Sequence, residues 1–377
     1  MAKKQILIIC GEPSGELHAS LLATEIKKLS PEIKISGVGS SLLAQAGAEI
    51  IFDTKDLSVM GLFDVLKKLP KFILLKQLIL DKIKQGKFDA VIFVDFSGFN
   101  LRLARAINNS LPTIYYVSPQ VWASRAKRIA VIKKYIRKMI VLFEFEKEFY
   151  MKHGLEADCV GHALLDVVKP SIGKDELLHK LSLANDKTTI ALLPGSRKQE
   201  INKILPIMLK TAQLINQKIN AQFVIAKPKQ TDWGIYDRIT AKFKIEVKFV
   251  EGNTYDALNI ADFALVCSGT ATLETAIMEK PFLIIYKMGL LNYLLYRPQV
   301  KIPFIGIVNI VAGRKIIPEY IQFGAAPAKI AANALELLDN RIKLENMRVE
   351  LAAVKSLLGQ PGAAHRAAKI IVDFLKN

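Results

Sequence analysis

Short apolar runs alternate with amphipathic stretches through the first half of the chain. The runs span residues 6–10, 33–38, 90–94, 113–117 and 139–143. An amphipathic stretch at residues 16–29 predicts a helix between the first two runs. Because the run at 90–94 is apolar at every position, it predicts a strand that is buried on both faces. Strands separated by helices indicate βαβ units and a parallel sheet.

The second half repeats this alternation after an irregular segment. Its predicted strands are residues 189–193, 222–226, 245–250, 263–267 and 281–286, with a helix at 200–217. The intervening residues 161–187 contain Gly161, Pro170 and Gly173, and we predict that they form a linker. The sequence therefore predicts an α/β protein with two Rossmann-like parallel-sheet domains that face a cleft, residues 1–160 and 188–358.

The tail of the chain is predicted to be helical. From Pro327 it reads as two helices parted by residues 359–362, whose sequence is Gly-Gln-Pro-Gly. The last helix lies within residues 359–377. It either packs back on the N-terminal domain or exchanges into a partner chain, so a monomer and a homodimer both fit.

Composition narrows the class of protein. Of the 377 residues, 51% are apolar, which excludes a disordered tail protein. Cys10, Cys159 and Cys267 lie far apart without a C-x-x-C pair, so we expect no disulfides and a reducing cytoplasm. The first apolar run is too short for a signal peptide, and no apolar stretch reaches the ~18–20 residues of a spanning helix.

The formal net charge of +18 predicts an anionic partner, either nucleic acid, anionic lipid or a phosphorylated substrate. One dense basic run contains no acid; its members are Arg125, Lys127, Arg128, Lys133, Lys134, Arg137 and Lys138. Such a run can equally be a solvated helix face. Because Tyr135 is the single aromatic residue interleaved in this run, where stacking on bases would need several, we favour a membrane surface and expect no nucleic acid.

A second candidate for membrane contact is the apolar pattern at residues 62–83. Apolar residues recur there at helical spacing among lysines, and Pro70 should kink or divide the helix. A core helix is the usual explanation, but a wide apolar face ringed with lysines is typical of an interfacial helix. The predicted membrane contacts are Val65, Leu66, Leu69, Phe72, Ile73, Lys67, Lys68 and Lys71.

Ligands of open parallel sheets bind beyond the carboxyl ends of the strands. The strongest candidate follows the strand at 263–267 and comprises Ser268, Gly269, Thr270, Ala271, Thr272, Leu273 and Glu274. Small residues let a phosphate approach the free N–H groups of a helix N-terminus, and Glu274 can reach two ribose hydroxyls. The alternative is simple capping by Ser268 or Thr270, with Glu274 completing a capping box.

Two further loops follow predicted strands. Arg197 ends a Pro-Gly-Ser-Arg sequence after residues 189–193 and can pair with a diphosphate, although an arginine in a surface loop is the commoner case. After the first strand comes a loop that is neither a P-loop nor a dinucleotide fingerprint. It can hold an acceptor sugar or phosphate, and its residues are Gly11, Glu12, Pro13, Ser14, Gly15 and Glu16.

Asp95 directly follows the strand at 90–94. It can cap the next helix, or it can face the cleft as a general base for a hydroxyl nucleophile. Trp122 follows another strand and serves either the acceptor site or core packing. His18 and His162 are isolated, so we expect structural roles for them. Without an Asp-x-Asp pair or a His/Cys cluster, we predict no catalytic metal.

Seven of these motifs, in this order, resemble the lipid-A-disaccharide synthase family, the inverting GT-B glycosyltransferases of lipid A assembly. The resemblance covers nearly the whole chain. It rests on residues 11–16, Asp95 with Phe99-Asn100, 116–123, Gly161-His162, 193–197, 268–274 and 309–314. The chain departs from the family pattern at Glu16, Ser97-Gly98, Ser124 and Ala163, which puts the fit of the acceptor or its acyl chains in doubt.

The resemblance implies transfer of 2,3-diacylglucosamine from its UDP derivative to the 6-hydroxyl of 2,3-diacylglucosamine 1-phosphate. It implies Asp95 and Arg197 as catalytic residues, and the 268–274 turn with Asn309 and Arg314 around UDP. Asn309 and Arg314 position either the donor phosphate or neighbouring loops. The resemblance also implies no cofactor, since the UDP-sugar is a substrate, and a peripheral location on the cytoplasmic face of the inner membrane.

Two other functions remain open from the residues alone. A UDP-sugar 2-epimerase of the same fold would act on a soluble nucleotide sugar and would need no lipid-facing helix. A non-catalytic, membrane-bound nucleotide-binding protein would bind UDP and form no product.

Overall fold

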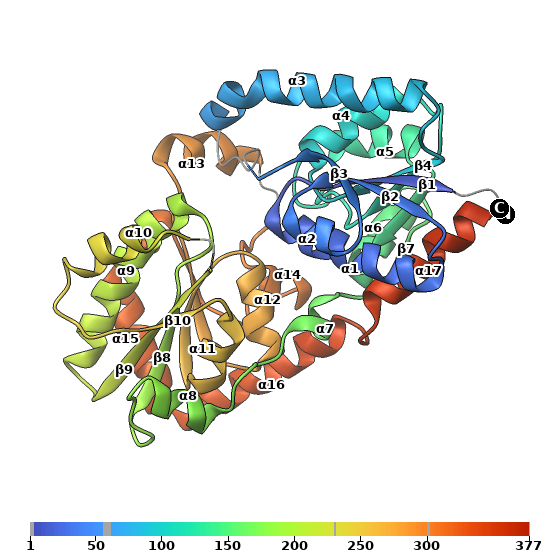
Figure 1. Cartoon of the computed structure of the whole chain (residues 1–377). Coiled ribbons are helices and arrows are strands. Elements are labelled where there is room, and N and C mark those ends of the chain that lie inside the picture. Colours follow the sequence, from blue (N-terminus) through green and yellow to red (C-terminus); the bar gives the residue numbers. More distant parts are fainter. Residues whose placement is uncertain (1–3, 56–61, 230, 300–301, 377) are drawn as a thin grey trace. The chain divides into compact units, whose positions relative to one another are not determined.

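The computed structural model divides the chain into two compact units. Unit 1 comprises Met1–Asp166, Tyr296–Lys301 and Leu358–Asn377, and unit 2 comprises Val167–Leu295 and Ile302–Leu357. The structure describes residues 4–55, 62–229, 231–299 and 302–376, with the side chains of 62–67 and 296 left out of the description. Each unit is built on one parallel sheet (Figure 1).

The sheet of unit 1 has seven parallel strands in the order β3-β2-β1-β4-β5-β6-β7. Their bounds are β1 (Gln5–Ile9), β2 (Lys34–Gly39), β3 (Glu49–Asp53), β4 (Ala90–Val94), β5 (Thr113–Tyr116), β6 (Lys138–Val141) and β7 (Asp158–Cys159). The central strand β4 is buried at every position, as its unbroken apolar run predicts. Its register against β1 pairs Ile6 with Ala90.

Helices of unit 1 connect these strands. They are α1 (Pro13–Leu29), α2 (Ser41–Gln45), α3 (Leu62–Lys84), α4 (Ser97–Ile107), α5 (Ile129–Tyr135), α6 (Glu144–Lys152) and α17 (Ala363–Lys376), with α7 (Leu164–Val167) at the unit boundary. The last helix, α17, packs along α1 although the two are far apart in sequence (Figure 1). Alanines on its buried face permit this close approach, and Arg366 Nη2 donates to the Val160 carbonyl at 2.7 Å.

Unit 2 repeats the architecture with six parallel strands in the order β10-β9-β8-β11-β12-β13. The strands are β8 (Thr188–Leu193), β9 (Ala221–Lys227), β10 (Lys248–Glu251), β11 (Phe263–Cys267), β12 (Phe282–Tyr286) and β13 (Glu319–Ile321). The helices are α8 (Lys174–Lys180), α9 (Lys198–Asn216), α10 (Trp233–Thr240), α11 (Thr254–Ile260), α12 (Thr270–Ile277), α13 (Leu290–Tyr296), α14 (Ile307–Val311), α15 (Pro327–Asp339) and α16 (Arg341–Leu357).

Several predicted elements need correction. The tail contains three helices, because Asn340 takes an extended backbone that ends α15, and its side chain accepts the Lys343 N–H at the start of α16. Pro70 does not divide α3, since this 23-residue helix continues through the missing backbone bond. The segment at 161–187 contains α7 and α8, and its Ser171 backbone N–H and hydroxyl both donate to Asp256 of unit 2 at 2.6 Å.

Strand order locates the expected binding edge in each unit. When the strands are counted within each unit, both sheets share the order 3-2-1-4-5-6, to which unit 1 adds a seventh strand, and this is the doubly wound order. The order reverses between β1 and β4 in unit 1 and between β8 and β11 in unit 2. Ligands of such sheets bind at this reversal, beyond the carboxyl ends of the strands. The loops after these four strands are the candidate loops named from the sequence.

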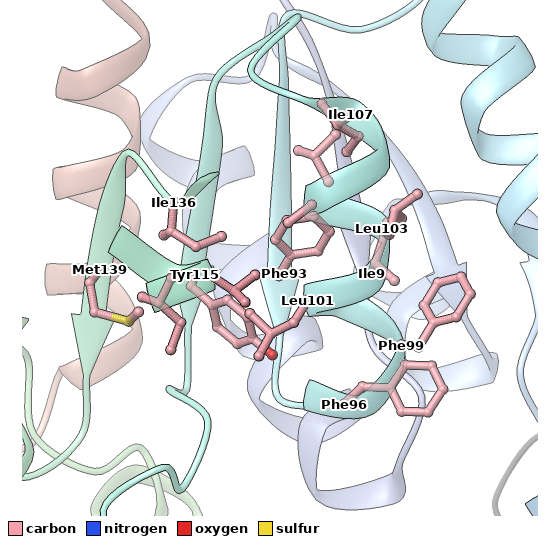
Figure 2. Packing of buried hydrophobic residues seen from close by; sticks show 14 of the residues in the cluster. Ile9, Phe93, Phe96, Phe99, Leu101, Leu103, Ile107, Tyr115, Ile136 and Met139 are labelled. Carbon is pink, nitrogen blue, oxygen red and sulfur yellow. The ribbon is translucent and has the colours of Figure 1, made fainter. Parts of the chain in front are cut away.

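A buried aromatic cluster supports the reversal point in unit 1. Phe96 and Phe99 stack with ring centroids 5.5 Å apart, and Phe72 of α3 lies 6.0 Å from each (Figure 2 shows Phe96 and Phe99). The loop after β1 lies against this cluster, because a Cβ built at Gly11 would fall 2.5 Å from the Phe96 ring. Position 11 therefore tolerates only glycine without rearrangement.

We predict that Gly11→Ala destabilises the protein by about 1–3 kcal/mol, because the added methyl overpacks against a buried ring. The matched control is Gly98→Ala in α4, where a Cβ meets no atom within 4 Å. Alanine there should be neutral or stabilise the helix by up to about 1 kcal/mol. Urea unfolding of both full-length variants measures the difference; equal midpoints would contradict the packing described here.

Candidate active site

The turn that carries Asp95 is held in an uncommon backbone conformation. Asp95 and Phe96 have φ values of +49° and +47°, and Val117 after the neighbouring strand β5 has φ +61°. A left-handed conformation is rare for a β-branched residue such as valine. The Asp95 N–H lies 3.3 Å from the Val117 carbonyl, so the two strained turns are joined. Such strain is concentrated at functional edges of proteins.

Buried partners fix the orientation of this turn. The Tyr115 hydroxyl and the Asn100 side-chain amide both donate to the Asp95 carbonyl, at 2.5 and 2.9 Å. Helix α4 begins at Ser97 with Phe96 as its N-cap and has no side-chain cap, so the capping alternative for Asp95 is wrong. A Cβ built at Gly15 would lie 3.8 Å from Asp95 Oδ2. The carboxylate therefore lies beside the first turn of α1.

The loop after β1 combines an open helix start with a structural carboxylate. Glu12 is the N-cap of α1 without a side-chain cap bond, and Pro13 occupies the first turn. Ser14 is half-buried, and its hydroxyl forms no hydrogen bond with another side chain or backbone group in the described ranges. Glu16, predicted to face the acceptor, instead accepts the backbone N–H groups of Ser40 and Leu42 at the start of α2. Its role in this structure is to cap that helix.

Trp122 is fixed by a carboxylate that sequence reasoning missed. Glu146 is buried and accepts hydrogen bonds from the Ser118 hydroxyl at 2.8 Å, Trp122 Nε1 at 3.2 Å and the Leu142 N–H at 3.2 Å. Burial raises the pKa of Glu146, and these donors oppose the shift. Trp122 also meets Phe145 edge-on at 5.1 Å. The half-buried indole thus packs against Phe145, and its hydrogen bond to Glu146 anchors the loop that carries Trp122.

The two isolated histidines are core residues, as expected. His18 and His162 are buried, with ring centroids 5.1 Å apart. Burial lowers the pKa of His18 to about 4 and that of His162 well below its ordinary value. Both rings are therefore neutral at physiological pH.

In unit 2, the turn after β11 leaves a helix N-terminus uncapped. Helix α12 starts at Thr270 behind Gly269, which has φ +151°, and no side chain caps it. The Ser268 hydroxyl donates to the Ile305 carbonyl at 3.1 Å, so the predicted capping alternative is wrong. Gly269 and Thr270 are exposed. Their position matches an anion site formed by backbone N–H groups.

Glu274 lies one turn further into α12. The Tyr255 hydroxyl donates to its carboxylate at 3.1 Å. Burial raises the pKa of Glu274, and the Tyr255 bond lowers it in part. The carboxylate is half-buried and keeps acceptor capacity beyond this one bond, as contact with ribose hydroxyls requires.

The Arg197 loop lies next to the Ser268 turn because β8 and β11 are neighbours in the sheet. Arg197 is the N-cap residue of α9, and its Nη1 donates to Glu200 at 3.0 Å. A Cβ built at Gly195 would fall 3.3 Å from the Cys267 sulfur, directly before Ser268. The guanidinium and the open start of α12 therefore share one edge of unit 2, as a diphosphate site needs.

Asn309 and Arg314 have different surroundings. Asn309 is fully buried, and its amide donates to the Ile317 carbonyl and to Glu319, each at 2.8 Å, while accepting the Ile316 and Ile317 N–H groups. Of its two expected roles, the structure supports loop positioning. Glu319, missed from the sequence, also accepts the Gly306 N–H at 2.9 Å.

Arg314 lies on the surface of unit 2. Its guanidinium forms an ion pair with Glu350 of α16, and its side chain is 62% exposed. For the predicted contact with UDP, the Arg314 guanidinium would have to leave Glu350.

The predicted membrane helix has a mixed face. Ile73 and Leu74 are 60% and 68% exposed and Leu69 is 40% exposed, whereas Phe72 is half-buried and packs on the Phe96 cluster. Lys68 is half-buried and Lys71 exposed. The side chains of Val65, Leu66 and Lys67 lie outside the described residues. None of the helices in the described ranges combines the length and hydropathy needed to cross a bilayer.

No cluster of three or more His, Cys, Asp or Glu side chains suited to a metal ion occurs within the part of the chain that the structure describes. Two doubly wound parallel-sheet units define a class of fold, the GT-B fold. The fold is similar to that of a UDP-GlcNAc 2-epimerase from Neisseria meningitidis bound to UDP-GlcNAc, with a TM-score of 0.65 at 15% identity over 99% of this chain and 100% of that one. It is also similar to a glycosyltransferase from Rickettsia africae ESF-5, with a TM-score of 0.56 at 13% identity and full coverage of both chains.

Sequence comparison defines the family within that class. The family model described as lipid-A-disaccharide synthetase matches residues 6–372. A lipid-A-disaccharide synthase from Syntrophus aciditrophicus (strain SB) is 40% identical over 381 residues, which cover 100% of this chain and 99% of the relative. The chain belongs to the lipid-A-disaccharide synthetase family, and it is a glycosyltransferase. The fold class and the family expected from the sequence are confirmed.

We predict that Asn309→Ala destabilises the protein by about 2–4 kcal/mol, because it leaves the Ile316 and Ile317 N–H groups and the Ile317 carbonyl without their side-chain partner and removes one donor from Glu319. Arg314→Ala should change stability by less than about 1 kcal/mol, because its ion pair is exposed. Thermal unfolding of the two variants against the parent measures both effects. A larger loss for Arg314→Ala than for Asn309→Ala would refute these assignments.

Proposed function

We propose that this chain joins two acylated glucosamines, transferring 2,3-diacylglucosamine from UDP to the 6-hydroxyl of 2,3-diacylglucosamine 1-phosphate. The family match over residues 6–372 carries this proposal. The arrangement of the candidate residues at the reversal points of both sheets supports it.

Transfer proceeds in one displacement with inversion. The acceptor 6-hydroxyl oxygen attacks the anomeric carbon while the bond from that carbon to the UDP oxygen breaks. Asp95 takes the hydroxyl proton as general base. The open start of α12, at Gly269 and Thr270, stabilises the charge that develops on the departing diphosphate, and Arg197 adds a guanidinium. Glu274 holds the ribose.

Charge stabilisation by the protein makes a metal ion unnecessary in this scheme. Backbone N–H groups at a helix N-terminus and one guanidinium supply the positive potential that Mg²⁺ provides in other transferases. UDP-sugar is a substrate here, so the reaction needs no cofactor.

Both substrates carry acyl chains, and we place the enzyme on the cytoplasmic face of the inner membrane. The exposed Leu69, Ile73 and Leu74 of α3 support this location. Lysines on the same helix would favour an anionic leaflet by about 1 kcal/mol each. Leu74 adds an exposed apolar side chain that was absent from the predicted contacts.

The decisive experiment incubates the purified protein with both diacylated substrates in detergent and excess chelator. We expect the disaccharide phosphate and one UDP per product. Tight UDP binding without product would support the non-catalytic alternative, and loss of activity with chelator, restored by Mg²⁺, would overturn the metal-free mechanism. Turnover of soluble UDP-GlcNAc at C2 would support an epimerase, whose likeness to this chain is one of fold at 15% identity.

A further inference from the structure

Part of the basic run turns inward toward the Asp95 turn. Arg128 is half-buried, and its Nη1 donates to the hydroxyl of Ser97 at 3.1 Å. Ser97 is the first residue of α4 and stands two positions after Asp95. Sequence reasoning assigned the whole run to a membrane surface, whereas this guanidinium lies at the start of the helix that follows the candidate base.

Two other arginines surround Arg128. Burial lowers the pKa of Arg128, and the positive charges of Arg125 and Arg102 lower it further, so each of these two residues acts on the Arg128 guanidinium. Arg102 belongs to α4 and is exposed. Arg125 has φ +56°, and its Nε donates to the Gln299 side chain at 3.4 Å. The loop that carries Arg125 thus takes an unfavourable backbone conformation.

Within the described parts of the chain, none of the three arginines forms an ion pair, whereas Lys138 of the same basic run pairs with Asp158 at 2.6 Å. Three like charges at one place cost stability unless an anion joins them. A phosphate monoester carries a charge of about −1.5 to −2 at pH 7 and offers three acceptor oxygens, which match the planar donors of arginine.

The cluster is also electrostatically linked to the candidate base. Tyr115 donates its hydroxyl to the Asp95 carbonyl at 2.5 Å. The pKa of this tyrosine is raised by burial and by the Asp95 carboxylate, and the Arg128 guanidinium opposes the shift. Both charges therefore act on one buried hydroxyl. A single sugar with a hydroxyl at one end and a phosphate at the other fits this arrangement, because its hydroxyl can face the Asp95 carboxylate and its phosphate the Arg128 guanidinium.

We propose that Arg128, with Arg125 and Arg102, binds the phosphate group of the acceptor sugar and thereby orients its free hydroxyl toward Asp95. The inference rests on the proposed function and adds to it a binding site for one end of the acceptor. Arg128 is the central group because Ser97 fixes it. Arg125 and Arg102 supply longer-range attraction.

The test compares two acceptors, diacylglucosamine 1-phosphate and the same lipid without its phosphate, with donor at saturation in detergent. Arg128→Gln should raise KM for the phosphorylated acceptor by about 10–100-fold, the value of a charged hydrogen bond in a partly buried site. For the phosphate-free acceptor, the KM of Arg128→Gln should stay within about twofold of the parent value. This acceptor has no phosphate for Arg128 to bind, so the substitution removes no contact with it. Arg128→Lys should be intermediate, because it keeps the charge and loses the planar fork.

Arg105 is an exposed residue in the last turn of α4, so Arg105→Gln is the matched control and should leave both KM values unchanged. If Arg128→Gln does not fold, the exposed Arg125→Gln gives the same comparison with a smaller ratio. Equal effects on both acceptors, or none, overturn the proposal. A parent enzyme without transferase activity would refute the proposed function separately. Phosphorus NMR titration with glucosamine 1-phosphate would then decide the site, since Arg128→Gln must weaken binding that Arg105→Gln leaves intact.

Discussion

The packing of the Asp95–Phe96 turn against the loop after β1 is the constraint on which the site of unit 1 depends. Two consecutive left-handed residues end β4, and the Phe96 ring lies where a side chain at position 11 would be. The Tyr115 hydroxyl and the Asn100 side-chain amide donate hydrogen bonds to the Asp95 carbonyl. These contacts restrict the backbone of the turn, and the carboxylate lies beside the start of α1. Helix α3 contributes Phe72 to the same cluster, which links the proposed membrane helix to the base.

Unit 2 achieves an equivalent rigidity with buried polar groups. The Asn309–Glu319 pair holds the segment around Ile305 and Gly306, and the Ser268 hydroxyl donates to the Ile305 carbonyl. This network occupies Ser268 and leaves the start of α12 uncapped. An open helix N-terminus is costly unless water or an anion satisfies it. The UDP proposal assigns that role to the diphosphate, with Arg197 on the adjacent loop.

Sequence patterns predicted the fold and the edges of the sheets because these depend on local periodicity. The predicted bounds of the strand at 263–267 agree with those of β11 in the structure. Asp95 was identified from its position after a buried strand. The partners of individual polar side chains depend on tertiary proximity, which periodicity does not encode. Glu16 caps a helix 24 residues away, and Glu146 holds Ser118 across 28 residues. Phe72 sat on the predicted apolar face, yet only the packed structure tells which part of a wide face is buried.

The most direct measurement of the central claim is the turnover of Asp95→Asn, with UDP affinity and thermal stability determined on the same preparation. Asparagine tolerates the left-handed conformation of this position, so the turn should survive. Loss of the base should lower turnover by about 10²–10⁴-fold, with UDP affinity and the unfolding midpoint unchanged. Turnover within a few-fold of the parent enzyme would contradict the account, because the carboxylate would then have no part in the chemistry.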